Sequence, residues 1–273
     1  MKSVVAAIAA FAGLALSASA GAHEFWISPD PYAAAIGERV VLRLRVGEKL
    51  KGDTLRYNPA KFNRFTTTMD SGTFELSSRL GDDPAASYVA QEPRLHVIAY
   101  QAKPERIDYA DIRKFKDYLA YEGLTPGKGN GAVARQARDA PFAETYTRYA
   151  KALVQVGPVT PGDSDVPLSL AYELIAQGNP YDGGESIAVA FLAKGTRLAG
   201  APVALFCKTG TVKRTMLGTD ERGEVQVPLG GCDEYLLNAV QIEGVEAASR
   251  PAESEAVPVR WHSHWASLSF GGR

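Results

Sequence analysis

Histidine is scarce in this chain of 273 residues, and three of its four histidines stand where metal chemistry is feasible. His23 follows a run of small residues near the N-terminus, while His262 and His264 form a His-x-His pair near the C-terminus. Neutral imidazole nitrogens are good ligands for nickel, copper and zinc. We therefore take His23, His262 and His264 as candidate metal ligands. Glu24, beside His23, is a weaker candidate because acidic residues near a terminus are common.

The first 22 residues have the pattern of a secretory signal peptide: a positive charge, an apolar run over 4–16 that is too short to span a bilayer, and small residues. Cleavage after Ala20 would leave Gly-Ala-His23, whose four nitrogens can surround copper(II) or nickel(II). Cleavage after Ala22 would make His23 the first residue, a bidentate chelate. We predict a periplasmic protein whose metal site begins at the new N-terminus, although a histidine near a mature terminus also arises by chance.

The two C-terminal histidines could act as a chelating pair if their segment is a strand. His262 and His264 would then share one face about 7 Å apart, with the flanking tryptophans on the other face. Surface histidines beside interface-forming tryptophans are the simpler explanation of this pattern. The pair and His23 each lack a third ligand, so a joint site requires the first and last strands to meet. His96, within an apolar segment, is interpreted as a structural residue.

Composition and the lack of known enzyme motifs argue against nucleic-acid binding, membrane association and several classes of enzyme. The formal charge is -1, and the basic residues are spread along the chain, which argues against nucleic acid or an anionic membrane as partner. No later segment approaches the roughly 18 apolar residues of a membrane-spanning helix, so the processed protein should not span a membrane. The motifs of serine hydrolases, zinc proteases, phosphate loops and dinucleotide sites are missing. We expect no catalytic residues and a binding protein rather than an enzyme.

Two cysteines, Cys207 and Cys232, make an even count in an exported chain, which predicts a disulfide between them. A thiolate metal site would need more sulfur or histidine nearby than the sequence offers. Cys207 ends an alternating segment with Val203 and Leu205, so it should point toward a core.

Alternating apolar residues predict a mainly β protein, and a repeat predicts how it is divided. The sequence at 37–46 recurs in similar form at 184–193, each copy following Pro-Tyr. We predict two tandem immunoglobulin-like antiparallel β-sandwich domains. Their expected bounds, after a signal peptide over 1–22, are 23–157 for the first domain, 158–166 for an exposed linker and 167–273 for the second domain.

A helical insertion is expected within the first domain, over about 108–140. Asp108 is its predicted N-cap, and Ile112, Phe115 and Leu119 form an apolar stripe that ends at Gly123. A second short helix is predicted over 132–138.

Several stretches carry a family resemblance: 22–27, 115–124, 146–153, 172–174 with 179–181, and 265–270. On these the chain resembles the NikM-like periplasmic proteins of unknown function that are associated with nickel uptake. The resemblance covers nearly the whole mature sequence. It implies an exported protein of tandem immunoglobulin-like domains that handles a transition metal, with His23 as a ligand. His262 and His264 do not belong to the family pattern, so their role rests on spacing alone.

The leading hypothesis is a periplasmic protein that binds nickel, or alternatively cobalt or copper, and passes it to an inner-membrane metal transporter. A second hypothesis is an adhesion or carbohydrate-binding module that uses exposed aromatic side chains. A third is a copper-dependent polysaccharide oxidase with an N-terminal histidine brace, in which His23 and a second histidine would hold the copper.

Overall fold

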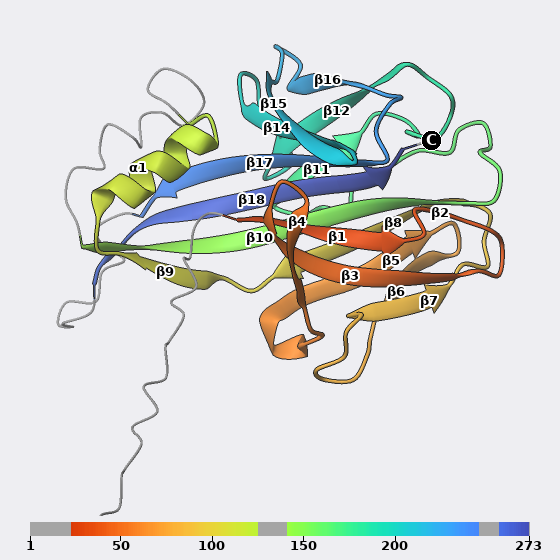
Figure 1. The fold of residues 1–273 in the computed structure, drawn as a ribbon, viewed down its shortest axis with the longest axis horizontal. Coiled ribbons are helices and arrows are strands. Elements are labelled where there is room, and N and C mark those ends of the chain that lie inside the picture. Colours follow the sequence, from red (N-terminus) through yellow and green to blue (C-terminus); the bar gives the residue numbers. More distant parts are fainter. Residues whose placement is uncertain (1–22, 125–140, 246–256, 273) are drawn as a thin grey trace, which may run out of the picture.

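The computed structural model describes residues 23–124, 141–245 and 257–272. Within these ranges the chain is mainly β with one α-helix, and its sheets pack face to face without closing into a barrel (Figure 1). The predicted mainly β sandwich architecture is confirmed. No helix in these ranges has the length and apolarity needed to cross a membrane. The predicted signal peptide, 1–22, and the predicted helix at 132–138 lie outside the described residues.

The N-terminal half contains ten strands, a short 3-10 helix and the α-helix. Their bounds are β1 Glu24–Asp30, β2 Ala33–Ala34, β3 Arg39–Glu48, β4 Lys51–Leu55, the 3-10 helix Pro59–Lys61, β5 Phe62–Met69, β6 Gly72–Glu75, β7 Ala86–Val89, β8 Arg94–Ala102, β9 Glu105–Tyr109, α1 Ile112–Tyr121 and β10 Phe142–Val156. The C-terminal half supplies β11 Tyr172–Ala176, β12 Ser186–Ala193, β13 Thr196–Arg197, β14 Pro202–Thr209, β15 Thr211–Gly218, β16 Glu224–Pro228, β17 Glu234–Gly244 and β18 Val259–Gly271.

A ten-stranded sheet runs through the whole molecule. Its main order is β15-β14-β17-β18-β10-β8-β5-β6, with the short strands β2 and β9 also pairing with β10. The two halves join where β10 and β18 pair in parallel, and these long strands lie side by side in the middle of the molecule (Figure 1). Each half thus contributes its strands to one continuous hydrogen-bonded sheet. The domain bounds expected from sequence stay a prediction.

Two four-stranded sheets cover opposite faces of the large sheet. Side chains alternate between the faces of a strand, so the two sets of neighbours of β10 identify the faces. Tyr149 and Leu153 join the hydrophobic core beneath β11, β12 and β16. Ala150 and Val154 join the core beneath β1, β3 and β7. The molecule therefore has three layers with a core on each side of the central sheet.

The sequence repeat corresponds to equivalent strands. Its first copy forms most of β3, which pairs with β1, β4 and β7. Its second copy contains all of β12, which pairs with β11, β13 and β16. Each copy is thus the central strand of a four-stranded sheet. In the first copy alternate residues are buried, as a strand with one face on a core requires, and in the second Ile187, Val189 and Phe191 follow the same alternation while Ala190 is buried as well.

Helix α1 lies on the same face of the large sheet as β1. Phe115 and Leu119 pack with Trp261 and Trp265 of β18 in one cluster, which confirms the predicted apolar stripe. The predicted N-cap was wrong, because Asp108 belongs to strand β9. The N-cap lies three residues later, at Asp111, whose carboxylate accepts the backbone N–H of Arg113 at 2.8 Å.

Most residues of the expected linker, 158–166, are exposed, but two of its acids are not. Asp163 and Asp165 are each only 6% exposed. The Asp163 carboxylate accepts the backbone N–H of Leu95 at 2.9 Å, and that of Asp165 lies 2.7 Å from the ammonium of Lys151. These contacts attach the segment to β8 and β10, with the two acids as partners of buried donors.

A disulfide joins Cys207 to Cys232, as predicted, with 5.4 Å between their Cα atoms. Both cysteines contact the core beneath β11, β12 and β16, which also agrees with the predicted inward direction of Cys207. The bond links β14 to the segment before β17, 25 residues later.

Replacing both cysteines by serine should lower the free energy of unfolding by about 3 kcal/mol, because the open chain gains conformational entropy when unfolded. Urea unfolding of the double variant beside the oxidised protein measures this difference. Equal midpoints and slopes would show that the bond contributes nothing.

Candidate metal-binding site

The first and last strands of the protein meet, as a joint metal site would require. The hydroxyl of Ser269 on β18 donates to the carbonyl of Ile27 on β1 at 2.6 Å. The residues of β18 alternate between the two faces of the sheet: Trp261 and Trp265 pack beneath α1, whereas Ala266 and Leu268 belong to the opposite core. His262 and His264 share the face of Ala266 and so point away from β1 and α1.

The structure brings His262 and His264 together. Their ring centroids are 4.2 Å apart, with the planes tilted by 34°. The ring of His264 also stacks on Tyr172 of β11, with 4.0 Å between centroids and 11° between planes. Packing between two aromatic rings fixes the orientation of His264 and leaves it 6% exposed. His262 is half-buried and forms the outer side of the pair.

The two imidazoles differ in their hydrogen bonds. Nε2 of His262 lies 3.1 Å from the hydroxyl oxygen of Thr147 on β10. Within the described part of the chain, neither ring nitrogen of His264 has a hydrogen-bond partner. A buried polar atom without a partner loses its hydration without compensation, so such atoms are rare and often functional. His264 is therefore the least satisfied histidine of the site.

Electrostatics keep this pair neutral. Burial first and then the neighbouring His262 lower the pKa of His264 to about 4, against the opposing effect of Glu243. Burial also lowers the pKa of His262 below its usual value. At neutral pH each ring consequently has one nitrogen with a free lone pair, which is the form that binds a metal.

A carboxylate on the neighbouring strand faces the pair. Glu243 lies opposite His262 in the antiparallel register of β17 and β18, and its Oε2 is 3.9 Å from Nε2 of His264. The hydroxyl of Tyr172 donates to Oε1 of Glu243 at 2.5 Å, and the ammonium of Lys194 lies 2.7 and 3.0 Å from the two carboxylate oxygens. These two donors lower the pKa of Glu243 although burial opposes them.

His23 and Glu24 lie on the other side of the large sheet. Nδ1 of His23 is 3.5 Å from a carboxylate oxygen of Glu48, at the end of β3. Glu24 is fully buried and accepts the hydroxyl of Tyr121 in α1 at 3.1 Å and the backbone N–H of Lys49 at 3.2 Å. The structure therefore does not bring His23 or Glu24 to the C-terminal pair.

The face beneath α1 contains two further buried carboxyl groups. Burial raises the pKa of Glu122 to about 8, and nearby Glu24 adds to this effect. Burial likewise raises the pKa of Glu144 to about 7 despite hydrogen bonds from Ser263 and Tyr109. These acids are held by neutral donors, as where Asn238 donates to Glu122 at 3.2 Å.

His96 is a structural residue, as predicted. It is fully buried, and its Nε2 and Nδ1 lie 2.9 Å from the Glu92 carbonyl oxygen and 3.1 Å from the Tyr88 hydroxyl oxygen. Both ring nitrogens are satisfied, in contrast with those of His264.

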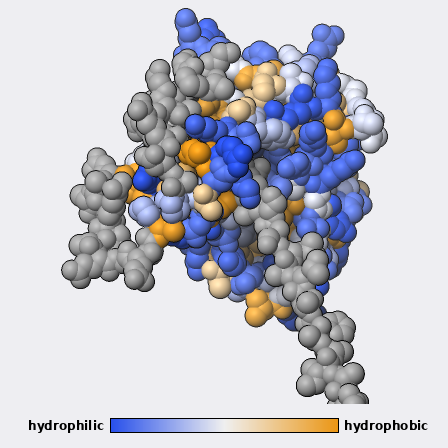
Figure 2. Space-filling view, turned by 60° about the vertical axis from the view of Figure 1, so that its left-hand side comes forward, coloured by the Kyte–Doolittle hydropathy of each residue, from blue (hydrophilic) through white to orange (hydrophobic). Residues whose placement is uncertain are grey.

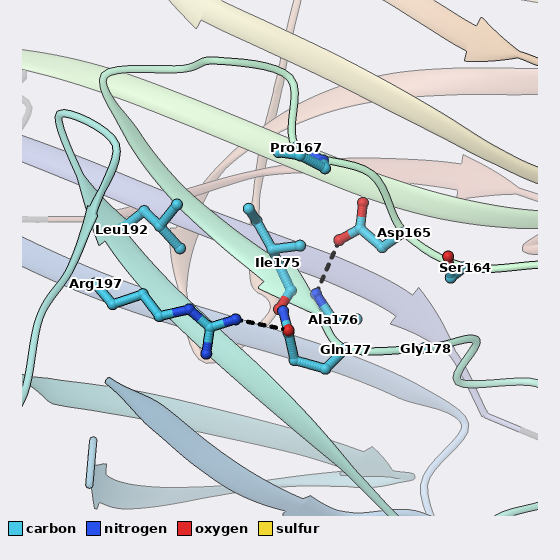
Figure 3. A pocket seen from close by; sticks show the side chains of 9 residues that line it. All are labelled: Ser164, Asp165, Pro167, Ile175, Ala176, Gln177, Gly178, Leu192 and Arg197. Atoms are coloured by element: carbon cyan, nitrogen blue, oxygen red, sulfur yellow. Dashed lines mark hydrogen bonds between the residues drawn. The ribbon is translucent and has the colours of Figure 1, made fainter. Parts of the chain in front are cut away.

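A pocket of about 450 Å³ lies between the linker and the outer side of β11 and β12 (Figure 3). Three of its polar side chains, those of Asp165, Gln177 and Arg197, already have partners. Asp165 accepts the backbone N–H of Ala176 at 2.9 Å, and Arg197 donates to Gln177 at 2.8 Å. The pocket shares no residue with the histidine pair. Its lining residues are Ser164, Asp165, Pro167, Ile175, Ala176, Gln177, Gly178, Leu192 and Arg197.

As the side chains stand, no group of three or more His, Cys, Asp or Glu residues within 23–124, 141–245 and 257–272 is placed to hold a metal ion. The site is therefore a two-histidine pair with an adjacent carboxylate. Sequence reasoning missed Tyr172, Lys194 and Glu243, because the contacts depend on strand register and on the packing of β11 over β18.

A comparison with known protein families identifies a match. A protein-family model described as "Domain of unknown function (DUF4198)" matches residues 20–243. No curated protein matches the chain. The matched region ends before β18, so it contains His23 and Glu24 but not His262 or His264.

Proposed function

This chain belongs to the DUF4198 family of domains of unknown function, and we propose that it is a periplasmic protein that binds a transition metal. The proposed cargo is nickel, or alternatively cobalt or copper, and the proposed role is to support uptake by an inner-membrane metal transporter. The signal-peptide pattern and the resemblance of the sequence to nickel-associated periplasmic proteins support the compartment and the role. The histidine pair supports the binding step.

One observation carries the proposal: His264 is buried beside His262 with both ring nitrogens unpaired. A structural histidine satisfies its nitrogens, as His96 does. A metal ion at the pair would use the lone pair that His264 keeps, and imidazole is a preferred ligand of nickel, cobalt and copper. The stacked Tyr172 ring holds His264 in place before the ion arrives.

A site with two protein histidines also suits a protein that must release its cargo. Structural metal sites use four protein ligands and hold the ion tightly. Here water or a ligand from the transporter would complete the coordination shell. A receiving protein can then replace ligands one at a time, which favours transfer over storage.

Neither alternative function, the carbohydrate-binding or adhesion module or the copper-dependent oxidase, is supported by a comparable structural observation. A carbohydrate-binding or adhesion surface of aromatic side chains would need exposed rings, but Trp26, Trp261 and Trp265 are at most 6% exposed. The face in Figure 2 is mostly hydrophilic outside the grey atoms, with hydrophobic residues in small groups. A histidine brace would need His23 and a second histidine at one ion, and the structure places the C-terminal pair on the opposite face.

Replacing His264 by glutamine should weaken nickel binding more than about tenfold, since loss of even an outer-shell partner typically costs 10–100-fold. His262→Gln should act in the same direction. Isothermal titration of correctly processed protein measures both, and circular dichroism checks that each variant is folded.

A His23→Gln background keeps the terminal chelate from masking the pair. Nickel binding that survives in His23→Gln and falls on adding His262→Gln or His264→Gln supports the site. Binding that vanishes with His23→Gln alone would assign the metal to the terminus and remove the pair from the proposal. Equal and weak heats of nickel binding in the unaltered protein and in all the variants would contradict the metal-binding function itself.

A further inference from the structure

A buried lysine meets two buried carboxyl groups where the linker and β11 pack over β10. The side chains of Lys151, Asp165 and Glu173 are 1%, 0% and 2% exposed. Nζ of Lys151 lies 2.7 Å from Oδ1 of Asp165 and 3.0 Å from Oε1 of Glu173. Lysine is rarely buried to this degree unless it is paired, and a desolvated lysine amine is a nucleophile. The triad therefore places a nucleophile beside one carboxyl carbon and a second acid.

The contact between Lys151 and Asp165 is short, but it is not a hydrogen bond. Within the described ranges Oδ1 of Asp165 has no hydrogen-bond partner, because the nearby Nζ does not meet the angles of such a bond. The carboxyl carbon Cγ is one bond of about 1.2 Å from Oδ1, so it lies within about 4 Å of Nζ. Reacting atoms in near-attack arrangements are about 3–3.5 Å apart. A small displacement of the amine would therefore bring it to the carboxyl carbon.

Backbone groups hold both acids in place beside the amine. The second oxygen of Asp165, Oδ2, accepts the N–H of Ala176 at 2.9 Å. Glu173 accepts the N–H groups of Leu168 and Leu170, at 2.8 and 3.3 Å. Neither carboxyl group can turn away from Lys151 without losing these bonds, so the arrangement is fixed before any reaction.

Burial favours neutral groups in this triad. It raises the pKa of Asp165, against the lowering effect of the Lys151 charge, and a protonated carboxyl group is attacked more readily than a carboxylate. In water an ammonium and a carboxylate are more stable than the amide they could form, but removal of water penalises the two ions and not the amide. Asp165 also lines the pocket in Figure 3, which gives a released water molecule a path out.

We propose that Lys151 and Asp165 form an intramolecular isopeptide bond, with Glu173 as the catalytic acid–base residue. The ion-paired triad of the structure is the reactant. The lone pair of Nζ forms the bond to Cγ of Asp165, and one Cγ–O bond breaks. Glu173 transfers two of the three ammonium protons to the departing oxygen, so one water molecule leaves and the third proton stays on the amide nitrogen. The bond would join β10 to the linker, and it does not depend on the proposed metal binding.

The mass of the reduced and denatured protein tests the bond directly. The chain should be lighter by one water molecule than its amino-acid sequence requires. Because trypsin does not cleave after an acylated lysine, the digest should contain one fragment over 149–194, also lighter by one water, in place of 149–151 and 152–194. Lys208, which is 43% exposed beside Glu234, is the control in the same digest and should be cleaved. An unreduced mass with complete cleavage after Lys151 would overturn the proposal.

Two variants assign the roles of the side chains. Lys151→Met should have the full mass that its sequence requires, and Glu173→Gln should leave most of the protein unreacted, with circular dichroism to check that both are folded. A loss of water that persists in Lys151→Met would place the dehydration elsewhere and contradict the bond. Full reaction in Glu173→Gln would contradict the catalytic role of Glu173. The digest of the unaltered protein decides on the bond itself even if a variant does not fold.

Discussion

Lys151→Met should lower the free energy of unfolding by about 3–5 kcal/mol, the cost typical of removing one partner from a buried ion pair. Lys151 is only 1% exposed in the middle of β10. Its ammonium lies 2.7 Å from Asp165 and 3.0 Å from Glu173, so one cation serves two buried carboxylates. The substitution keeps most of the side-chain volume but leaves both acids without their counter-charge.

The effect should be concentrated where the linker meets β10. Glu173 keeps hydrogen bonds from the backbone N–H groups of Leu168 and Leu170, at 2.8 and 3.3 Å. Asp165 keeps the backbone N–H of Ala176 as a donor, and burial already raises its pKa. We expect Asp165 to take up a proton in the variant, which recovers part of the loss.

Urea unfolding of Lys151→Met beside Lys208→Met measures the cost of the buried position. The Lys208 side chain is 43% exposed, so its ion pair with Glu234 should contribute at most about 1 kcal/mol. Similar losses in the two variants would contradict the assigned role of the buried triad.

Stability should fall as pH rises from about 6.5 to about 8, with Glu122 as a principal cause. Below that range the lowered pKa values of His96, His262 and His264 act in the opposite direction. The pKa of this carboxyl is raised from its ordinary value of 4.5 to about 8, first by burial and then by the charge of Glu24. Between these pH values the folded protein keeps a proton that the unfolded chain has released. The stabilisation from this group is therefore complete below its ordinary pKa and is lost as pH rises through the folded pKa, by at most about 1.4 kcal/mol per pH unit.

Glu122→Gln should flatten this dependence and make the protein more stable than the unaltered chain near pH 8. The amide has nearly the shape of the protonated carboxyl and carries no charge. Thermal unfolding at pH 5.5, 7 and 8.5 tests the difference, with the exposed Glu221→Gln as control. A dependence as steep in Glu122→Gln as in the unaltered protein would show that another group causes it.

Local patterns explain most of what could be predicted of the fold. The alternation in 39–46 and 186–193 reflects strands with one face on a core, and the repeat marks equivalent strands in two halves. The disulfide followed from the cysteine count and the expected compartment. The helix was expected in the right region, but its start was misplaced. Asp108 and Asp111 are both suitable N-cap residues, and only the pairing of β9 with β10 decides between them.

The candidate site was predicted only in part. Strand alternation correctly placed His262 and His264 on one face, with Trp261 and Trp265 on the other. A joint site also required the first and last strands to meet, and they do. The sequence did not determine on which face of the central sheet the first strand lies. In the structure β1 covers the face opposite to the histidine pair, so His23 lies across the sheet from His262 and His264. Glu243 was invisible as a neighbour because the register of β17 against β18 depends on packing along the whole sheet.

The sequence by itself determined the strands, the disulfide and the chemical character of the candidate ligands, because these depend on residue type and on spacing within a few positions. Only the tertiary structure decided which ligands are neighbours. The central sheet is formed by pairing β10 with β18 across more than a hundred residues, and its two faces separate side chains that the order of the chain gave no reason to separate. A buried histidine between Tyr172 and His262 is a product of that pairing.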